Sequence, residues 1–155
     1  MPVSNSSSPE HPSRLLVVDD DINNRLSLSR RLARRGYQVD TAEGGAEALD
    51  KLLGEHYDLV LLDQMMPEMS GIDLLRLLRA THSQTDLPVI MVTALDENET
   101  MAQALEEGAN DYVVKPVEIP EITARIQTQL ARSRVRRQEA ADRIGREATW
   151  EWDLE

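Results

Sequence analysis

Short apolar runs alternate with longer amphipathic stretches along most of this chain, and this pattern narrows the possible folds more than any other feature. Five runs predict strands, at residues 15–18, 37–41, 59–62, 89–93 and 112–114. The amphipathic stretches predict helices at residues 23–35, 45–55, 72–81 and 97–107, and a last helix beginning near Glu118. Strands that are apolar throughout are buried on both faces, so helices must cover both sides of their sheet. The sequence therefore predicts an α/β fold of five βα units around a five-stranded parallel sheet.

Length and composition indicate one domain with an appendage and exclude several kinds of protein. With 155 residues, of which 41% are hydrophobic, the chain can form a substantial core. The absence of cysteine excludes a disulfide scaffold, a thiolate metal site and a cysteine nucleophile. No apolar run approaches the roughly 20 residues of a membrane helix, and the start, MPVSNSSSPEHPS, lacks the pattern of a secretory signal. We therefore expect a soluble, cytoplasmic protein without membrane partners.

The charge changes along the chain and indicates where its parts begin and end. The formal net charge is −11, and residues 13–124, with 21 acidic and 10 basic side chains, carry the same net charge by themselves. Seven arginines against two acidic residues follow between positions 125 and 146. We expect a disordered tail at residues 1–12, a compact domain at 13–128 and a helical linker at 129–155.

Polar side chains stand at the carboxyl ends of four predicted strands. They are Asp19, Asp20 and Asp21 after the first strand, Asp63 after the third, Thr93 at the end of the fourth, and Lys115 with Pro116 after the fifth. The carboxyl ends of parallel strands meet at one edge of the sheet, where open α/β folds bind their ligands. Clustered carboxylates repel one another, and oxygen ligands without His or Cys favour Mg²⁺ or Mn²⁺. With a hydroxyl and an ammonium group nearby, an aspartate can accept a phosphoryl group there.

Each of these residues also has an ordinary structural explanation. An aspartate after a strand is often the N-cap of the next helix, and we expect that role for Asp21. A lone threonine after a strand, or a lone Lys-Pro pair in a loop, indicates no function. Their occurrence together at successive strand ends is what favours a phosphoryl site.

Four segments, LLVVDDDINNR, LVLLDQMMPEMSGIDLL, PVIMVTA and GANDYVVKP, are similar to the signature blocks of the response-regulator receiver domain of two-component signalling. The resemblance covers residues 13–128. It implies a flavodoxin-like three-layer sandwich with strand order 2-1-3-4-5 and an extended C-terminal helix. It also implies a signalling phosphoacceptor that catalyses only its own phosphotransfer and slow autodephosphorylation, rather than an enzyme with a separate substrate.

Carried over by position, the resemblance assigns the acidic residues to a phosphorylation site. Asp63 would accept a phosphoryl group from a histidine kinase or a phosphotransfer protein. Asp20 and Asp63, with Asp19 acting through water and with the backbone carbonyl of Met65, would hold Mg²⁺. Met65 and Leu95 also occupy positions whose side chains flank the attacking water in this family. Both are apolar and cannot orient water, so we expect slow autodephosphorylation.

The same resemblance implies a switch next to this site. Lys115, joined to Pro116 by a cis peptide bond, would pair with the carboxylate and phosphoryl oxygens. Thr93 would hydrogen-bond the phosphoryl group, and Tyr112 would turn inward as Thr93 moves. This movement would bias the surface formed by the fourth helix, the fifth strand and the fifth helix. The structural alternative for Tyr112 is a half-buried aromatic residue of a strand. Gly71 is expected to permit a sharp turn after Pro67.

The chain beyond the domain is rich in helix formers, so the last helix is expected to run on to about Ile144. A seam at heptad spacing favours a weak parallel coiled coil over a solvated helix: Ile126, Leu130, Ala140 and Ile144, interrupted by Ser133 and Arg137. Gly145 is expected to end or bend the helix. We expect a homodimer through this helix, because residues 96–107, on the alternative dimer surface, include no basic residue.

The function that follows the linker has several alternatives. No helix-turn-helix follows the arginines and no aromatic residues are interleaved with them, so direct nucleic-acid binding is not expected. The last residues, ATWEWDLE, resemble the opening of a PAS domain, a module that often precedes a diguanylate cyclase. A receiver truncated before such an output and a stand-alone receiver adaptor agree equally with the sequence. An aspartate-nucleophile phosphatase is less favoured, because Met65 stands where its second carboxylate belongs and we recognise no cap segment.

Overall fold

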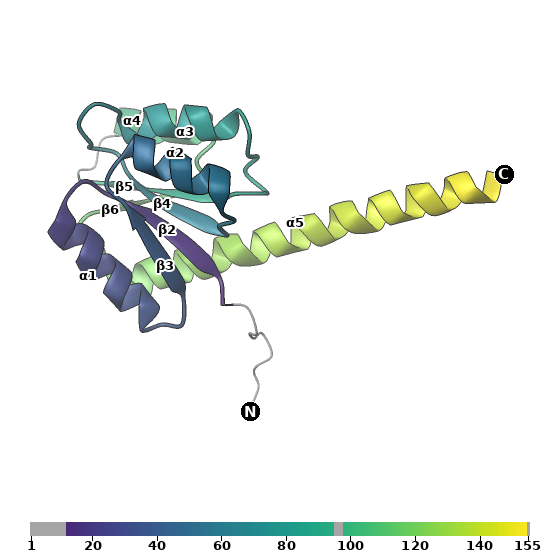
Figure 1. Cartoon of the computed structure of the whole chain (residues 1–155), viewed down its shortest axis with the longest axis horizontal. Helices are drawn as coiled ribbons and strands as arrows, with labels where there is room; N and C mark the ends of the chain where they lie inside the picture. The colour runs from purple at the N-terminus through teal and green to yellow at the C-terminus, as the bar shows by residue number, and fades with distance from the viewer. Residues whose placement is uncertain (1–11, 95–97, 155) are drawn as a thin grey trace.

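The computed structural model describes residues 12–94 and 98–154, and its strands and helices alternate as the sequence predicts (Figure 1). The strands are β2 (Arg14–Val18), β3 (Gln38–Ala42), β4 (Leu59–Asp63), β5 (Val89–Thr93) and β6 (Asp111–Val114). The helices are α1 (Ile22–Ala33), α2 (Gly45–Gly54), α3 (Gly71–Arg79), α4 (Asn98–Glu106) and α5 (Ile119–Leu154). Apart from the end of α5, the predicted boundaries differ from these by no more than two residues in the described part of the chain. The expected N-terminal tail, except for Pro12, lies outside the described residues.

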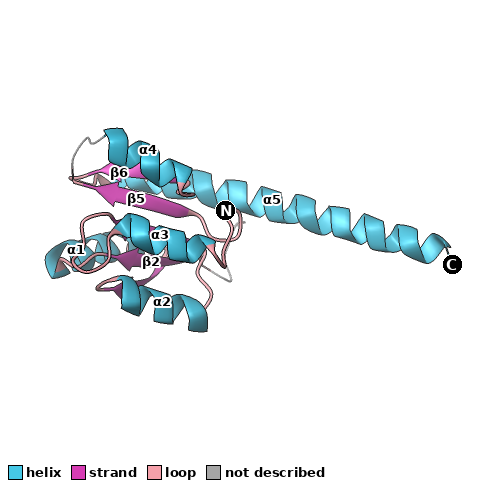
Figure 2. Ribbon diagram, turned by 90° about the horizontal axis from the view of Figure 1, so that it is seen from above, coloured by secondary structure: helices cyan, strands magenta, loops and turns pink. Residues whose placement is uncertain are grey.

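The five strands form one parallel sheet in the order β3-β2-β4-β5-β6, which is the predicted order 2-1-3-4-5 along the chain. Helices α1 and α5 cover one face, and α2, α3 and α4 cover the other (Figure 2). Each face has its own core because successive strand residues point to opposite sides. On β2, Leu15 and Val17 face α1 and α5, whereas Leu16 and Val18 face the other three helices.

Helix α5 departs from the prediction in two ways. It continues through Gly145 to Leu154, so Gly145 does not end it. The expectation that Ile126 and Leu130 belong to a coiled-coil seam is wrong, because both side chains are buried in the core of their own domain. A helical face that is apolar in the sequence is therefore covered by the same chain. Ser133, beyond the expected domain boundary, is buried as well.

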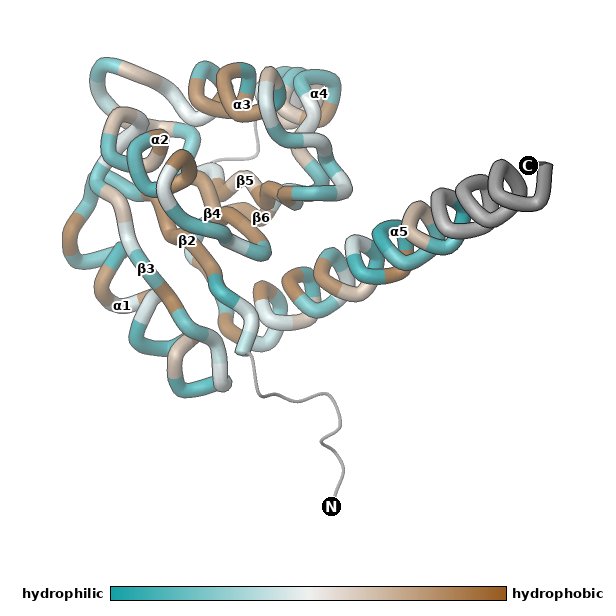
Figure 3. The backbone as a smooth tube through the Cα atoms, turned by 45° about the vertical axis from the view of Figure 1, so that its right-hand side comes forward, coloured by the Kyte–Doolittle hydropathy of each residue, from teal (hydrophilic) through white to brown (hydrophobic). Residues whose placement is uncertain are grey.

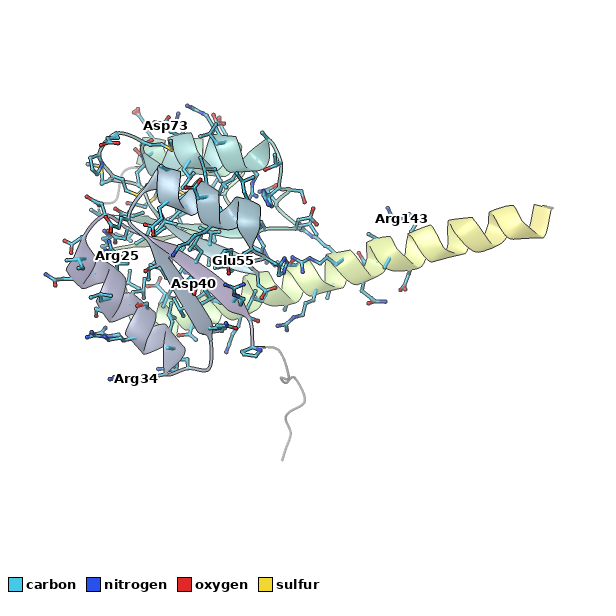
Figure 4. All side chains as sticks on the ribbon, viewed as in Figure 1. Arg25, Arg34, Asp40, Glu55, Asp73 and Arg143 are labelled. Carbon is cyan, nitrogen blue, oxygen red and sulfur yellow. The ribbon has the colours of Figure 1, made fainter. Side chains whose placement is uncertain are left out.

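Beyond Arg137, α5 projects away from the domain as a single helix (Figures 1 and 3). We call residues 138–154 the arm; Arg143, labelled in Figure 4, lies on it well outside the domain. None of the helices formed by the described residues is both long and apolar enough to cross a membrane.

Candidate functional site

Three aspartates meet at the carboxyl edge of the sheet. Asp19 and Asp20 follow β2, and Asp63 ends the neighbouring strand β4. One carboxylate oxygen of each lies within 4.8 Å of the corresponding oxygens of the other two. Asp63 is 3% exposed and Asp19 is 7% exposed, whereas Asp20 is open to solvent. Three acidic groups therefore share one small, partly buried site.

The surroundings of Asp63 disfavour its ionised form. Burial raises the pKa of Asp63, and the charges of Asp19 and Asp20 raise it further, although Lys115 opposes them. Its Oδ1 atom is buried and, apart from an ion pair with Lys115, has no hydrogen-bond partner among the described residues. A cation would relieve both the repulsion and the unsatisfied oxygen. Because all the nearby ligands are carboxylate oxygens, the site fits a hard divalent ion such as Mg²⁺.

Lys115 lies between two of these carboxylates. Its Nζ is 2.9 Å from Oδ1 of Asp63 and 3.6 Å from Oδ2 of Asp19. Burial alone would lower the pKa of Lys115, but the hydrogen bond and charge of Asp63, together with Asp19, outweigh it and raise the pKa. The backbone N–H of Lys115 donates to the carbonyl of Thr93 at 2.7 Å, and the peptide bond to Pro116 is cis. A charged ammonium group is thus held directly beside Asp63.

The remaining predicted site residues lie on the two strands beyond β4. Thr93 ends β5, is 6% exposed, and follows Val92, which pairs with Asp63 across the sheet. Tyr112, on β6, pairs with Met91 of β5 and packs, partly buried, against the core beneath α2, α3 and α4. The structure therefore places Thr93 at the edge that holds Asp63, and Tyr112 two residues earlier in the β5–β6 register.

The loop after β4 is shaped differently from the prediction. The residue with a positive φ is Glu68, at 70°, and not Gly71. A Cβ atom at Gly71 would lie 2.5 Å from the backbone carbonyl oxygen of Asp63, so glycine is needed there for close approach and not for a turn. The N–H of Gly71 also donates to the carbonyl of Gln64 at 3.0 Å. The first turn of α3 is thus held directly against the backbone of Asp63.

Two residues beside the site bear on access to it. The side chain of Met65, two residues after Asp63, is 68% exposed. Leu95, its expected counterpart, lies outside the described residues. A hollow of about 210 Å³ opens between α1 and the segment after β6 and reaches Asp63. Its polar lining includes Asn24, Ser27 and Arg31 of α1.

Asp21 caps the start of α1, and Arg25 within α1 holds the backbone of Asp19. The side chain of Asp21 accepts hydrogen bonds from the N–H groups of Asn23 and Asn24 at 2.9 and 3.1 Å, which confirms its role as N-cap. Arg25, labelled in Figure 4, is buried and donates from Nη1 to the carbonyl oxygen of Asp19 at 2.8 Å. The sequence analysis missed Arg25, although it lies seven residues before the buried Leu32 and therefore on the same helical face.

Comparisons with known proteins agree with this geometry. A family sequence model described as the response regulator receiver domain matches residues 15–127. Response regulator MprA of Mycobacterium ulcerans is 40% identical over 131 residues, which are 84% of this chain and 56% of that protein. MprA of Mycolicibacterium vanbaalenii is 43% identical over 122 residues, 79% of this chain and 52% of that protein. The chain spans about half the length of these curated relatives.

Several solved structures are similar in both fold and sequence. The receiver domain of the Francisella response regulator 1452 has a TM-score of 0.72 and 33% identity, covering 78% of this chain and 98% of that one. A probable two-component system response regulator/GGDEF domain protein has a TM-score of 0.75 and 34% identity, and the match covers 79% of this chain and 50% of that one. The response regulator TrrA of Thermotoga maritima was solved in complex with Mg²⁺-BeF. It has a TM-score of 0.68 and 36% identity, and the match covers 76% of this chain and 98% of that one.

Proposed function

Because this chain belongs to the response-regulator receiver family, we propose that Asp63 is its phosphoacceptor and that a histidine kinase or phosphotransfer protein is the donor. The observation that carries the proposal is the buried Asp63 carboxylate with the Lys115 ammonium 2.9 Å away, inside a cluster of three aspartates. In the transfer, a carboxylate oxygen of Asp63 bonds to phosphorus as the bond from phosphorus to the histidine nitrogen breaks. That nitrogen keeps the electron pair, and the product is an acyl phosphate.

The neighbouring residues would stabilise the transferred group. Lys115 is placed to donate to its oxygens, and Thr93, at the end of the adjacent strand β5, supplies a hydroxyl. Asp20 and Asp63, with Asp19 through water and the Met65 carbonyl, would hold Mg²⁺. When bound, the ion would neutralise negative charge on the phosphoryl group. The Mg²⁺-BeF complex of the similar TrrA structure supports this assignment.

The switch proposal extends this chemistry to the surface formed by α4, β6 and α5. A phosphoryl group on Asp63 adds negative charge and acceptor oxygens, which would draw the Thr93 hydroxyl toward it. Tyr112 on β6 is only partly buried, so it has room to pack more deeply when Thr93 moves. The surface that includes Tyr112 would then differ between the two states.

The direct test identifies the phosphorylated residue. The chain is incubated with acetyl phosphate and Mg²⁺, and the product is reduced with borohydride, which converts an aspartyl phosphate to homoserine. We expect one phosphoryl group per chain and homoserine at position 63 by mass spectrometry. No phosphoryl uptake, or uptake on another residue, would contradict the proposal.

Removal of one metal ligand is expected to weaken Mg²⁺ binding without harming the fold. In Asp20→Asn, the Mg²⁺ dissociation constant measured by calorimetry should rise by about tenfold or more, because a charged ligand becomes neutral. Asp21→Asn is the matched control, since it makes the same change at the next residue and asparagine also caps helices well. Equal Mg²⁺ affinities of the two variants would remove Asp20 from the metal site.

Slow loss of the phosphoryl group is expected in the wild-type chain. The double variant Met65→Asn with Leu95→Glu introduces polar groups able to orient water, and its phosphorylated state should decay about tenfold faster. The decay is followed by mass spectrometry after acetyl phosphate is removed, with Met65→Leu as the apolar control. Rapid decay of the wild type that the double variant leaves unchanged would show that these positions do not govern lifetime.

We also infer that two copies pair through the arm and not through the α4 surface. The sequence of α4 has acidic residues and no basic ones, which disfavours reciprocal ion pairs there. Ile126 and Leu130 are already buried within each chain, so the pairing contacts would lie beyond Arg137. Sedimentation velocity should show a dimer in the presence of beryllofluoride and Mg²⁺; a monomer at high concentration, both with and without them, would contradict this.

The arm is proposed to connect the receiver to an output domain of the PAS or diguanylate cyclase type. Two of the similar solved structures are described as response regulator/GGDEF domain proteins, and this chain covers 50% and 49% of them. Their architecture supports an output after the receiver, whereas a stand-alone adaptor remains the alternative.

A further inference from the structure

The part of α5 between the receiver core and the arm is hydrogen-bonded to the loop that precedes β5, at the edge of the sheet opposite to Asp63. This loop, residues 80–88, connects α3 to β5. The hydroxyl of Ser133 donates to the backbone carbonyl of Thr85, and Ser133 is 5% exposed. One helical turn later, Nη2 of Arg137 donates to the backbone carbonyl of Asp86 at 2.6 Å. The helix is therefore held at two successive turns, next to the burial of Leu130 in the core.

The loop itself is fixed from inside the domain by Arg79. This arginine is the last residue of α3, and burial lowers its pKa to about 10. Its guanidinium group donates to five acceptors: the carbonyl oxygens of His82, Ser83, Leu87 and Gly108, and Oδ1 of Asn110. It has no carboxylate partner among the described residues. Because one rigid guanidinium group donates both to the loop and to the segment just before β6, the loop is a firm support and not a free connection.

We propose that the α3–β5 loop is a docking surface for residues 133–137 of α5, and that this contact sets the direction in which the arm leaves the receiver. Beyond Leu130, the last core residue of α5, this segment also makes an exposed hydrogen bond from Arg134 to the hydroxyl of Ser13 at 3.3 Å. The polar contacts of Ser133 and Arg137 with the loop fix the helix axis at two further points. An output domain joined to the arm would thereby keep one position relative to the receiver. The inference does not depend on phosphorylation of Asp63, and its test uses no phosphodonor.

The chain offers a matched control for this contact. Arg132 and Arg136 immediately precede Ser133 and Arg137 and are exposed, and their side chains make no hydrogen bond or ion pair with other described residues. The variant Ser133→Ala with Arg137→Ala removes both loop contacts but leaves Leu130 in place. The variant Arg132→Ala with Arg136→Ala changes the same helical segment, beside Gln84 and Thr85, but removes neither hydrogen bond to the loop. A difference between the two variants therefore isolates the contacts.

The direction of the arm is measured as a distance distribution between two spin labels by pulsed electron resonance. The chain has no cysteine, so labels can be attached at Leu53→Cys on α2, which is 79% exposed, and at Ala141→Cys on the arm. We expect one narrow distribution in the parent chain and in the Arg132/Arg136 control. In the Ser133/Arg137 variant, the width should at least double. Arg137→Ala alone, which removes a partly exposed group, should give an intermediate width.

Two results would overturn the proposal. One is an unchanged width in the Ser133/Arg137 variant, which would show that the core contacts and the Arg134–Ser13 hydrogen bond direct the arm without the loop. The other is equal broadening in the control, which would assign the effect to general loss of arginine charge. If the double variant does not melt cooperatively, Arg137→Ala decides by itself: broadening supports the docking contact, and an unchanged width refutes it.

Discussion

Replacing Asp63 with asparagine is expected to reduce phosphoryl uptake from acetyl phosphate by at least about a hundredfold. The amide has no negative charge and is a poor nucleophile, and the two nearby carboxylates are not placed to take over. Oδ1 of Asp19 accepts a hydrogen bond from the N–H of Asp21 at 2.9 Å, and Asp20 is open to water. Uptake is measured by the mass of the intact chain over time.

The same variant should also change how the protein responds to Mg²⁺. Because the pKa of Asp63 is raised in the folded state, its ionised form lowers stability at neutral pH, and that cost disappears as pH falls and the group is protonated. Asparagine removes this cost at every pH, so Asp63→Asn should melt no lower than the wild type without Mg²⁺. It should also gain little from added Mg²⁺. Asp50→Asn, on the exposed side of α2, is the control and should behave like the wild type. Normal uptake by Asp63→Asn would reject the phosphoacceptor assignment.

Ending the chain after Thr128 is expected to lower the melting temperature by roughly 10 °C. The shortened chain loses Leu130, which is 6% exposed and belongs to the core shared by α1, α5 and the sheet. Full burial of a leucine side chain contributes about 2 to 3 kcal/mol. The truncation also removes the buried Ser133 and lets the turn that contains Ile126 fray.

A chain that ends after Gln138 is the control for this truncation. It keeps Leu130, Ser133 and Arg137 and loses the arm except for its first residue, so its melting temperature should stay within about 2 °C of the full chain. Calorimetry of the three chains would place the end of the cooperative unit near residue 137 instead of 128. Equal melting temperatures of the two truncated chains would show that residues 129–137 add no stability.

The sequence predicted the parts of this molecule that follow from periodicity and strand order. Apolar runs located all five strands. Asp19, Asp63 and Thr93, at or just after the ends of β2, β4 and β5, lie at one edge because parallel strands share their carboxyl edge. Asp21 was recognisable as a cap because capping depends on a side chain and its two or three nearest neighbours.

The missed features depend on contacts between distant segments. The heptad spacing of Ile126 and Leu130 showed an apolar helical face, but not whether the same chain or a second copy covers it. The positive φ of Glu68 and the contact of Gly71 with the Asp63 carbonyl arise from how α3 meets β4. The sequence pattern does not show that Arg25 is buried or that Arg79 is half-buried, because only the folded backbone brings up the carbonyl groups that accept their hydrogen bonds.

The position of Lys115 beside Asp63 has a consequence for the size of the signal. By formal charge, the three aspartates and the one lysine leave the site with two negative charges. One bound divalent ion brings this sum to zero. A phosphoryl group of roughly −2 on Asp63 would replace the single charge of its carboxylate, so the sum would return to about −1. On the proposed function, the fold would convert an imbalance of about one elementary charge, buried at the end of β4, into a different surface more than a strand away.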